Sequence, residues 1–176
     1  MGKRSDFARR PMDAYQTIDP RAIPPLLPFL GGVETFAEPC VGEGRLLLAL
    51  ERHGLSCAYR GDILAGRDAF DLHVSDMNGI DAIITNPPWT REILHPLIRH
   101  FQRLAPTWLL FDADWPHTKQ SAPFIANCSH IVSVGRLIWM EGTKQTGKDN
   151  CAWYRFHAQH HEGPRFYGPQ ALARAA

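Results

Sequence analysis

Short apolar runs that end at turn-forming residues, each followed by a helical pattern or a further run, constrain the fold of this chain more than any other feature. The runs predict buried strands, and the residues that repeat at three- and four-residue spacing predict helices. The strand candidates are 33–38, 57–60 and 82–85, and the helix candidates are 45–53 and 91–104. Because strands that alternate with helices form a parallel sheet covered on both faces, we expect an open, doubly wound α/β fold.

The C-terminal half adds three more strand candidates, at 108–111, 131–134 and 151–156. A glycine-bearing loop, 141–150, joins the last two strand candidates and predicts a hairpin. One strand of that hairpin must run against the others. The sequence therefore predicts a mostly parallel, Rossmann-like sheet with a closing antiparallel hairpin.

Length and composition favour one globular domain. The chain has 176 residues, of which 44% are hydrophobic, and a domain of this size buries about 70% of the surface that its unfolded chain exposes. We expect the domain at 13–160, with a mobile basic arm at 1–12 and a C-terminal tail at 161–176. The longest early apolar stretch, 22–33, is too short to cross a bilayer and contains three prolines. The expectation is therefore a cytoplasmic protein with no membrane partner.

The four cysteines and the distribution of charge say less about function. The cysteines form no C-x-x-C pair, so buried thiols are a better interpretation than a zinc site or a disulfide framework.

The formal net charge is +1, but residues 61–85 carry five acids and one base, and residues 86–176 carry ten bases and six acids. The basic C-terminal half could face a phosphate-bearing partner, but on charge alone solvated surface is the better interpretation.

A glycine-rich loop separates the first strand candidate from the first helix candidate. Gly42 and Gly44 allow a sharp turn and a close approach of a ligand to the backbone. In open α/β sheets, ligands bind beyond the carboxyl ends of the strands, which is where this loop would lie. Glu38 ends the first strand candidate and could accept hydrogen bonds from an ammonium or hydroxyl group. Asp62 ends the second, where an acid typically binds ribose hydroxyls, although it could also be a simple turn residue.

The Asn-Pro-Pro-Trp motif at 86–89 follows the buried strand candidate 82–85 directly. The two prolines remove two backbone donors and stiffen the chain. The Asn86 side chain and the Pro87 carbonyl could then present two acceptors to an exocyclic amine, with Trp89 stacked on the ring that carries it. A rigid structural loop is the alternative interpretation of Asn86, Pro87, Pro88 and Trp89.

The glycine loop at 38–44, Asp62 and the motif at 86–89, in this order, resemble the S-adenosylmethionine-dependent amino-methyltransferases. The resemblance is to the DNA adenine-N6 methyltransferases in particular. The small phage-type members look most similar, because residues 147–154 are similar to their final hairpin. The resemblance covers 15–156 and implies a class I methyltransferase fold, a nucleic-acid partner, most naturally DNA, and S-adenosyl-L-methionine as cofactor. It implies no metal.

The resemblance also implies a role for each matching residue. Glu38, Gly42 and Gly44 would line the methionine end of the cofactor, with Cys40 in the same loop. Asp62 would bind the ribose hydroxyls, and Asp68, Ala69 and Phe70 would lie along the adenine. The residues near the N-terminus that match the segment closing over the cofactor's carboxylate are Tyr15 and Thr17. The residues that would hold the target amine are Asn86, Pro87 and Trp89, and Asn86 itself would lie against the cofactor.

Two further groups of residues are candidates for contacts with substrate. Trp115 follows the strand candidate 108–111 at the same edge of the sheet, and either contacts the target base or simply packs. Arg136, Lys144 and Lys148 lie in or near the final hairpin and could contact phosphates, or form an ordinary charged loop. His157, His160 and His161 lack acidic or cysteine partners at ligand spacing, so solvated surface is their better interpretation.

Three functions remain open on the sequence. The first is methylation of the N6 amine of adenine in DNA. The second keeps the cofactor and changes the acceptor to adenine in RNA or to a glutamine amide of a protein. The third is a non-catalytic nucleic-acid-binding module on the same fold.

Overall fold

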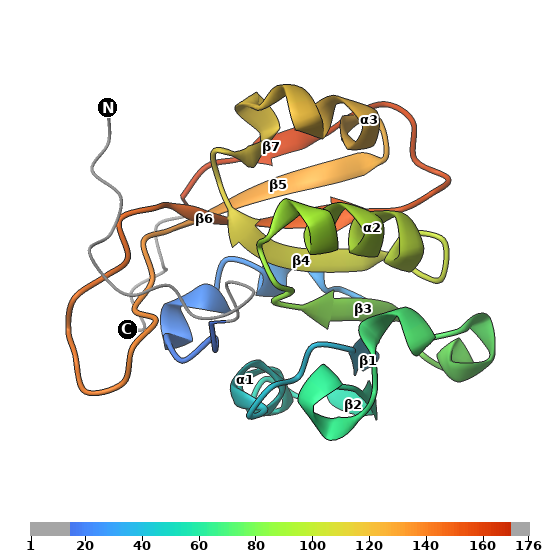
Figure 1. The fold of residues 1–176 in the computed structure, drawn as a ribbon, viewed down its shortest axis with the longest axis horizontal. Coiled ribbons are helices and arrows are strands. Elements are labelled where there is room, and N and C mark those ends of the chain that lie inside the picture. Colours follow the sequence, from blue (N-terminus) through green and yellow to red (C-terminus); the bar gives the residue numbers. More distant parts are fainter. Residues whose placement is uncertain (1–14, 170–176) are drawn as a thin grey trace.

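The chain forms one seven-stranded sheet in the order β2-β1-β3-β4-β6-β5-β7 (Figure 1). The structure is a computed structural model that describes residues 15–169, so the arm expected at 1–12 lies outside the described residues. The strands are β1 (Thr35–Glu38), β2 (Ser56–Arg60), β3 (Ala82–Thr85), β4 (Thr107–Asp112), β5 (Cys128–Gly135), β6 (Cys151–Phe156) and β7 (Arg165–Tyr167).

Among the described strands, only β6 runs against its neighbours. The strand pairs β1–β2, β1–β3, β3–β4 and β5–β7 are all parallel. β6 lies between β4 and β5 and pairs antiparallel with both. The prediction of a mostly parallel sheet with one antiparallel hairpin is confirmed.

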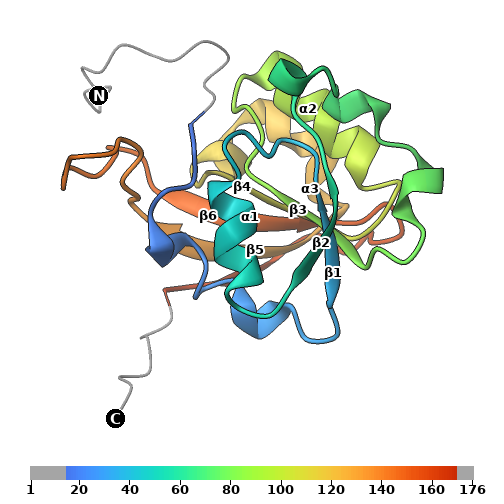
Figure 2. The same cartoon turned by 90° about the horizontal axis from the view of Figure 1, so that it is seen from below.

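Helices cover the two faces of the sheet from different parts of the chain. The helix α1 (Arg45–Glu51) lies on one face, and α2 (Arg91–Phe101) lies on the opposite side with the short α3 (Ala122–Ile125) (Figure 2). Two separate cores follow from this arrangement. The core under α2 contains Leu94 and Leu97, and the core under α1 contains Leu46 and Leu50.

Alternation along the central strands supplies both cores. On β4, Leu109 and Phe111 face the core under α2, whereas Trp108 and Leu110 face the core under α1. Successive side chains of a strand point to opposite faces, so a central strand buried on both sides must be apolar throughout. This requirement explains why 108–111 is a continuous apolar run.

The predicted C-terminal tail is wrong in one respect. Arg165–Tyr167 form β7, which pairs with β5 at the edge of the sheet. The Tyr167 ring stacks on His130 of β5 with ring centroids 5.2 Å apart and packs against Phe29. Three residues flanked by histidines, glycine and proline give no strand pattern, so this edge strand depends on contacts that the sequence does not display.

The parallel strands end at one edge, where the site residues gather. β1 ends at Glu38, β3 ends at Thr85, and β4 ends at Asp112. The register pairs Ala37 with Ile83, so the chain leaves β1 and β3 at neighbouring places. This shared edge is the feature of the fold that positions the candidate site.

None of the helices in residues 15–169 combines the length and the apolar character that a membrane span requires.

The early part of the chain is anchored to the sheet through a buried indole. Trp153 on β6 is fully buried, and its Nε1–H donates to the Ala22 carbonyl at 2.7 Å. Ala22 closes the 3₁₀ helix Pro20–Ala22, whose cap Asp19 accepts from the Arg21 backbone N–H at 3.0 Å. This contact holds residues 19–22 against the α1 face of the sheet.

We expect Trp153→Phe to lower the free energy of unfolding by about 1–3 kcal/mol, because the Ala22 carbonyl would remain buried without its donor. Urea denaturation followed by circular dichroism measures the change. An unchanged midpoint would contradict the anchoring role, and an unchanged slope of the transition would show that the variant keeps the parent's compactness.

Candidate functional site

One cavity of about 530 Å³ lies at the carboxyl edge of the sheet. It is formed by the ends of β1 and β3, the loops that follow β1, β2 and β3, the first turn of α1, the first two turns of α2, and residues 15–17. Its size suits a small-molecule ligand. The predicted site residues that line it are Tyr15, Thr17, Glu38, Cys40, Gly42, Asp62, Asp68, Ala69, Phe70, Asn86 and Pro88.

The glycine loop after β1 turns sharply and is tied to the end of β2. Gly42 and Gly44 both have positive φ angles, 51° and 77°, which side chains rarely adopt. The Gly42 backbone N–H donates to Asp62 Oδ2 at 2.9 Å. Gly44 is the residue that caps α1 and is not part of the cavity wall. Of the two glycines, Gly42 is therefore the one that a ligand would meet.

Two aspartates shape the wall beyond β2. Asp62 caps the 3₁₀ helix Ile63–Ala65 and accepts from the Leu64 backbone N–H at 2.8 Å. Asp68 caps the next 3₁₀ helix, Ala69–Asp71, and accepts from the Phe70 backbone N–H at 3.0 Å. Both therefore act as turn residues, as the alternative interpretation of Asp62 held. A carboxylate has about four acceptor positions, so each retains capacity for a ligand hydroxyl or amine.

Glu38 is a buried carboxyl group in the wall of the cavity. It is 1% exposed, and its Oε2 has no hydrogen-bond partner. Burial raises the pKa of Glu38 well above its usual range, and the Leu47 backbone N–H opposes this only in part. An orphaned acid at the end of β1 is costly for folding alone, which favours a ligand that donates to it.

Cys40 also lines the cavity, but as a neutral thiol. Burial raises its pKa to about 12, so the reactive thiolate is scarce at physiological pH. We assign it to the apolar part of the wall.

The Asn86 side-chain amide is held by three hydrogen bonds. Its Nδ2 donates to the Tyr15 carbonyl at 2.7 Å and to Thr17 Oγ1 at 3.0 Å. Its Oδ1 accepts from Trp89 Nε1 at 3.0 Å. Tyr15 and Thr17 thus contact the motif directly, in addition to lining the cavity.

Trp89 lies beside Asn86 rather than in the cavity wall. Its Nε1–H is shared between Asn86 Oδ1 and the Leu110 carbonyl, at 3.0 and 3.2 Å. Its ring packs edge-on against Trp139, with centroids 5.4 Å apart and an interplanar angle of 88°. Pro87 is buried and Pro88 lines the cavity. The geometry gives Trp89 a contact with the amide of Asn86 that the stacking prediction did not include.

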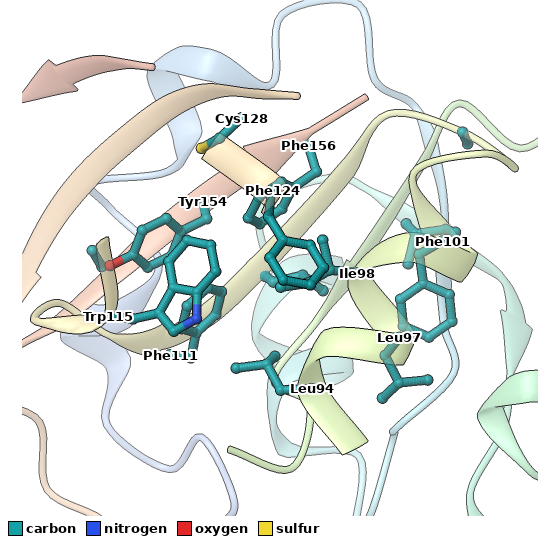
Figure 3. Close-up of a cluster of buried hydrophobic side chains, with 14 of the residues drawn as sticks. Leu94, Leu97, Ile98, Phe101, Phe111, Trp115, Phe124, Cys128, Tyr154 and Phe156 are labelled. Carbon is teal, nitrogen blue, oxygen red and sulfur yellow. The ribbon is translucent and has the colours of Figure 1, made fainter. Parts of the chain in front are cut away.

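The expected contact of Trp115 with a substrate is a prediction that the structure corrects. Trp115 is 3% exposed and lies in the core under α2, among Phe111, Phe124 and Tyr154 (Figure 3). Its Nε1–H donates to His95 Nε2 at 3.0 Å. The chain turns back after β4 into the 3₁₀ helix Trp115–His117, which directs the indole inward. Packing, the alternative that the sequence left open, is what the structure shows.

Arg136, Lys144 and Lys148 are exposed in the long connection between β5 and β6 and do not line the cavity. This connection projects from the sheet beside the early part of the chain (Figure 1). Two contacts tie it to the site: Glu141 pairs with Arg45 of α1 at 2.6 Å, and the Ile138 backbone N–H donates to Asp19 Oδ2 at 2.8 Å. The three basic residues therefore belong to a surface next to the cavity.

Sequence reasoning missed several residues of the site. Gln16 lies over Gly42, and its Oε1 accepts from the Glu43 backbone N–H at 3.2 Å. Ile63 and Leu64 line the cavity although Leu64 is 91% exposed, and their only sequence signal was an apolar pair after Asp62. Trp139 packs against both Tyr15 and Trp89. Trp139 and Trp89 are 50 positions apart in the sequence, so no local pattern predicts their contact.

Comparison with known proteins supports the fold. No protein-family model matches the sequence, and no curated protein matches it. The crystal structure of a candidate RNA methyltransferase from Pyrococcus horikoshii is similar, with a TM-score of 0.50 and 15% sequence identity. The alignment covers 75% of this chain and 79% of that one. Together with the strand order, this likeness shows that the chain has a Rossmann-like class I methyltransferase fold.

We expect Glu38→Gln to stabilise the ligand-free protein, and more so as the pH rises. Because the folded-state pKa of Glu38 is raised above its ordinary value of 4.5, folding takes up a proton between these two pKa values. The parent therefore loses stability as the pH rises through that window, whereas a neutral amide does not. Near pH 8 the melting temperature should exceed the parent's by at least about 2–4 °C, and the gain should shrink toward pH 4.

Scanning calorimetry at several pH values measures this gain, with the exposed Glu34→Gln as the matched control. A gain that is the same at pH 4 and pH 8 would show that ionisation of Glu38 is not its cause.

Proposed function

We propose that this protein is a methyltransferase that uses S-adenosylmethionine to methylate the exocyclic N6 amine of adenine in DNA. The observation that carries the proposal is the single cavity that joins the glycine loop, Glu38 and Asp62 to the side chain of Asn86. A ligand held by the first three residues would lie against the fourth. The resemblance of the motif at 86–89 supports the choice of an amine acceptor.

The residues of the cavity fit this cofactor. Glu38 presents an orphaned oxygen that an ammonium group would satisfy, and the charge of that group would favour the ionised acid. Asp62, two residues beyond the end of β2, would accept from ribose hydroxyls, and the exposed apolar side chains of Ile63 and Leu64 would contact an aromatic base. Asp68 would accept from the amine of that base. Gly42 allows the ligand to approach the backbone.

The proposed reaction depends mainly on the position of the amine and on acceptors for its hydrogens. When bound, S-adenosylmethionine would supply a methyl group on cationic sulfur. The nitrogen lone pair would form the new C–N bond, the C–S electron pair would stay on sulfur, and one N–H proton would leave to water. An aromatic amine is a weak nucleophile because its lone pair is delocalised into the ring. As the resemblance implies, Asn86 Oδ1 and the Pro87 carbonyl would accept the amine hydrogens and favour a pyramidal nitrogen. Such preorganised acceptors contribute to the rate by positioning.

A nucleic-acid acceptor is supported by the connection between β5 and β6. Arg136, Lys144 and Lys148 are exposed there, next to the edge that carries Asn86. A base inside a duplex must leave the stack to reach such a cavity, at a cost of a few kcal/mol, whereas a single strand avoids most of it. Phosphate contacts from this surface would offset that cost.

RNA adenine is the second candidate acceptor. The similar structure from Pyrococcus horikoshii is described as a candidate RNA methyltransferase, and the phosphate contacts proposed here do not distinguish the two sugars. Parallel assays of DNA, RNA and protein acceptors with tritiated cofactor separate the alternatives, including a glutamine amide.

We expect Asn86→Ala to lower methyl transfer by at least 100-fold, far more than it lowers the affinity for S-adenosylmethionine, because an acceptor used in the reacting complex is removed while Glu38 and Asp62 remain. Calorimetry measures the affinity, and tritium transfer to an adenine-containing oligonucleotide measures the rate. The exposed Asn78→Ala is the matched control and should keep the parent's activity. Near-parental transfer by Asn86→Ala would rule out the proposed role of Asn86.

We expect Lys144→Ala/Lys148→Ala to weaken DNA binding and to reduce the slope of log affinity against log salt by about 1–2, because each lost phosphate contact releases about one counterion fewer. Fluorescence anisotropy of a labelled oligonucleotide at several salt concentrations measures both quantities. Arg103→Ala/Lys119→Ala removes the same charge from exposed residues outside this connection and is the control. Equal losses in both double variants would exclude a specific role for the connection.

A further inference from the structure

The amide of Asn86 is fixed in one of its two orientations by groups that differ in what they can accept or donate. The Tyr15 carbonyl can only accept, so the amide nitrogen must face it at 2.7 Å. The Trp89 Nε1–H can only donate, so the amide oxygen must face it at 3.0 Å. If the amide were rotated by half a turn, its oxygen would face the Tyr15 carbonyl, which is also an acceptor. Its nitrogen would face the Trp89 Nε1–H, which is also a donor.

Thr17 completes this arrangement. Its Oγ1 lies 3.0 Å from Asn86 Nδ2, so both hydrogens of the amide nitrogen have an acceptor within residues 15–17. The Thr17 side chain is buried, which makes an unpaired hydroxyl or amide hydrogen costly there. The amide nitrogen donates two hydrogen bonds, and the amide oxygen accepts one from Trp89. The amide therefore retains one acceptor position on Oδ1 and no donor.

The segment that carries Thr17 is held on both sides. Gln16 Oε1 accepts from the Glu43 backbone N–H in the glycine loop, and Asp19 Oδ2 accepts from the Ile138 backbone N–H. The Tyr15 ring packs against Trp139, which in turn packs on Trp89. These contacts connect the amide of Asn86 to the glycine loop and to the connection between β5 and β6.

We propose that Thr17 is a positioning residue. With the Tyr15 carbonyl and Trp89, it holds the Asn86 amide so that both hydrogens of its nitrogen are bonded within the protein and its oxygen keeps one acceptor position for the substrate. The site then selects an acceptor atom that carries a hydrogen, such as an exocyclic amine, and rejects a carbonyl oxygen or a ring nitrogen without hydrogen. The inference rests on the proposed function for its catalytic consequence. The orientation of the amide itself does not depend on activity.

Two substitutions of Thr17 separate the hydroxyl from the shape of the side chain. Thr17→Val keeps the branched shape and removes the acceptor, and Thr17→Ser keeps the hydroxyl. We expect kcat to fall about tenfold in Thr17→Val, a rate factor that corresponds to about 1.4 kcal/mol, with cofactor affinity and KM for the oligonucleotide near the parent's values. Thr17→Ser should restore most of kcat.

A second measurement reports on the amide without any reaction. In ¹⁵N-labelled full-length protein, the Asn86 side-chain amide signals are those that Asn86→Ala removes. We expect one of the two amide protons to exchange with water about tenfold faster in Thr17→Val than in the parent, because its acceptor is gone. The exchange in Thr17→Ser should match the parent's. In Trp89→Phe the Tyr15 carbonyl and the Thr17 hydroxyl still accept from the Asn86 nitrogen, so we expect a smaller change in the exchange rate of its protons.

The outcomes distinguish this inference from the proposed function. If the parent methylates no acceptor, the proposed function fails, and the exchange rates still decide whether Thr17 holds the amide. If the parent is active and Thr17→Val keeps both the parent's kcat and its exchange rates, the inference is wrong. A Thr17→Ser variant as impaired as Thr17→Val would also overturn it, since the hydroxyl would then not be the cause.

Discussion

The hydrogen bonds of the Asn86 side chain join the motif at 86–89 to residues 15–17, which line the same cavity. The residue follows β3, its nitrogen contacts residues 15–17, and its oxygen contacts Trp89. The same early segment reaches the glycine loop through Gln16 and the connection between β5 and β6 through Asp19. The nitrogen of this amide has both its partners in residues 15–17 and the oxygen has one in its own motif, so the three bonds fix residues 15–17 relative to the motif.

Glu38 illustrates the opposite kind of constraint, a residue that the fold alone does not favour. Its carboxyl group is buried with one orphaned oxygen, and burial raises its pKa well above the usual range. A well-packed apolar residue at the end of β1 would be less costly. The Asn86 amide has protein partners for both hydrogens of its nitrogen and for one position of its oxygen, whereas Glu38 Oε2 has none. The contrast separates two parts of the cavity wall: one amide is preorganised by internal bonds, and one buried carboxyl oxygen has no donor.

Much of the fold could be predicted because its central elements are locally encoded. The strand predicted at 82–85 matches β3, and the helix predicted from residue 91 begins there, because a buried run before Asn-Pro-Pro leaves little freedom. The glycine loop and the motif carry the candidate site for the same reason. Trp115 was misplaced because a tryptophan beyond a strand end can turn outward or inward, and only the packing of Phe111 and Tyr154 decides. β7 depends on pairing with a strand 35 positions earlier, from His130 to Arg165.

The contribution of the connection between β5 and β6 follows from topology rather than from sequence. β6 is inserted antiparallel between β4 and β5, and its first residue, Cys151, pairs with Asp112 on one side and Gly135 on the other. The start of β6 and the end of β5 must therefore lie at the edge where β4 ends, beside Asn86. Any chain that joins Gly135 to Cys151 has to pass this edge, whatever its residues. The reversed strand thus places this connection beside the site, where Trp139 packs against Trp89 and the exposed basic residues lie next to the cavity.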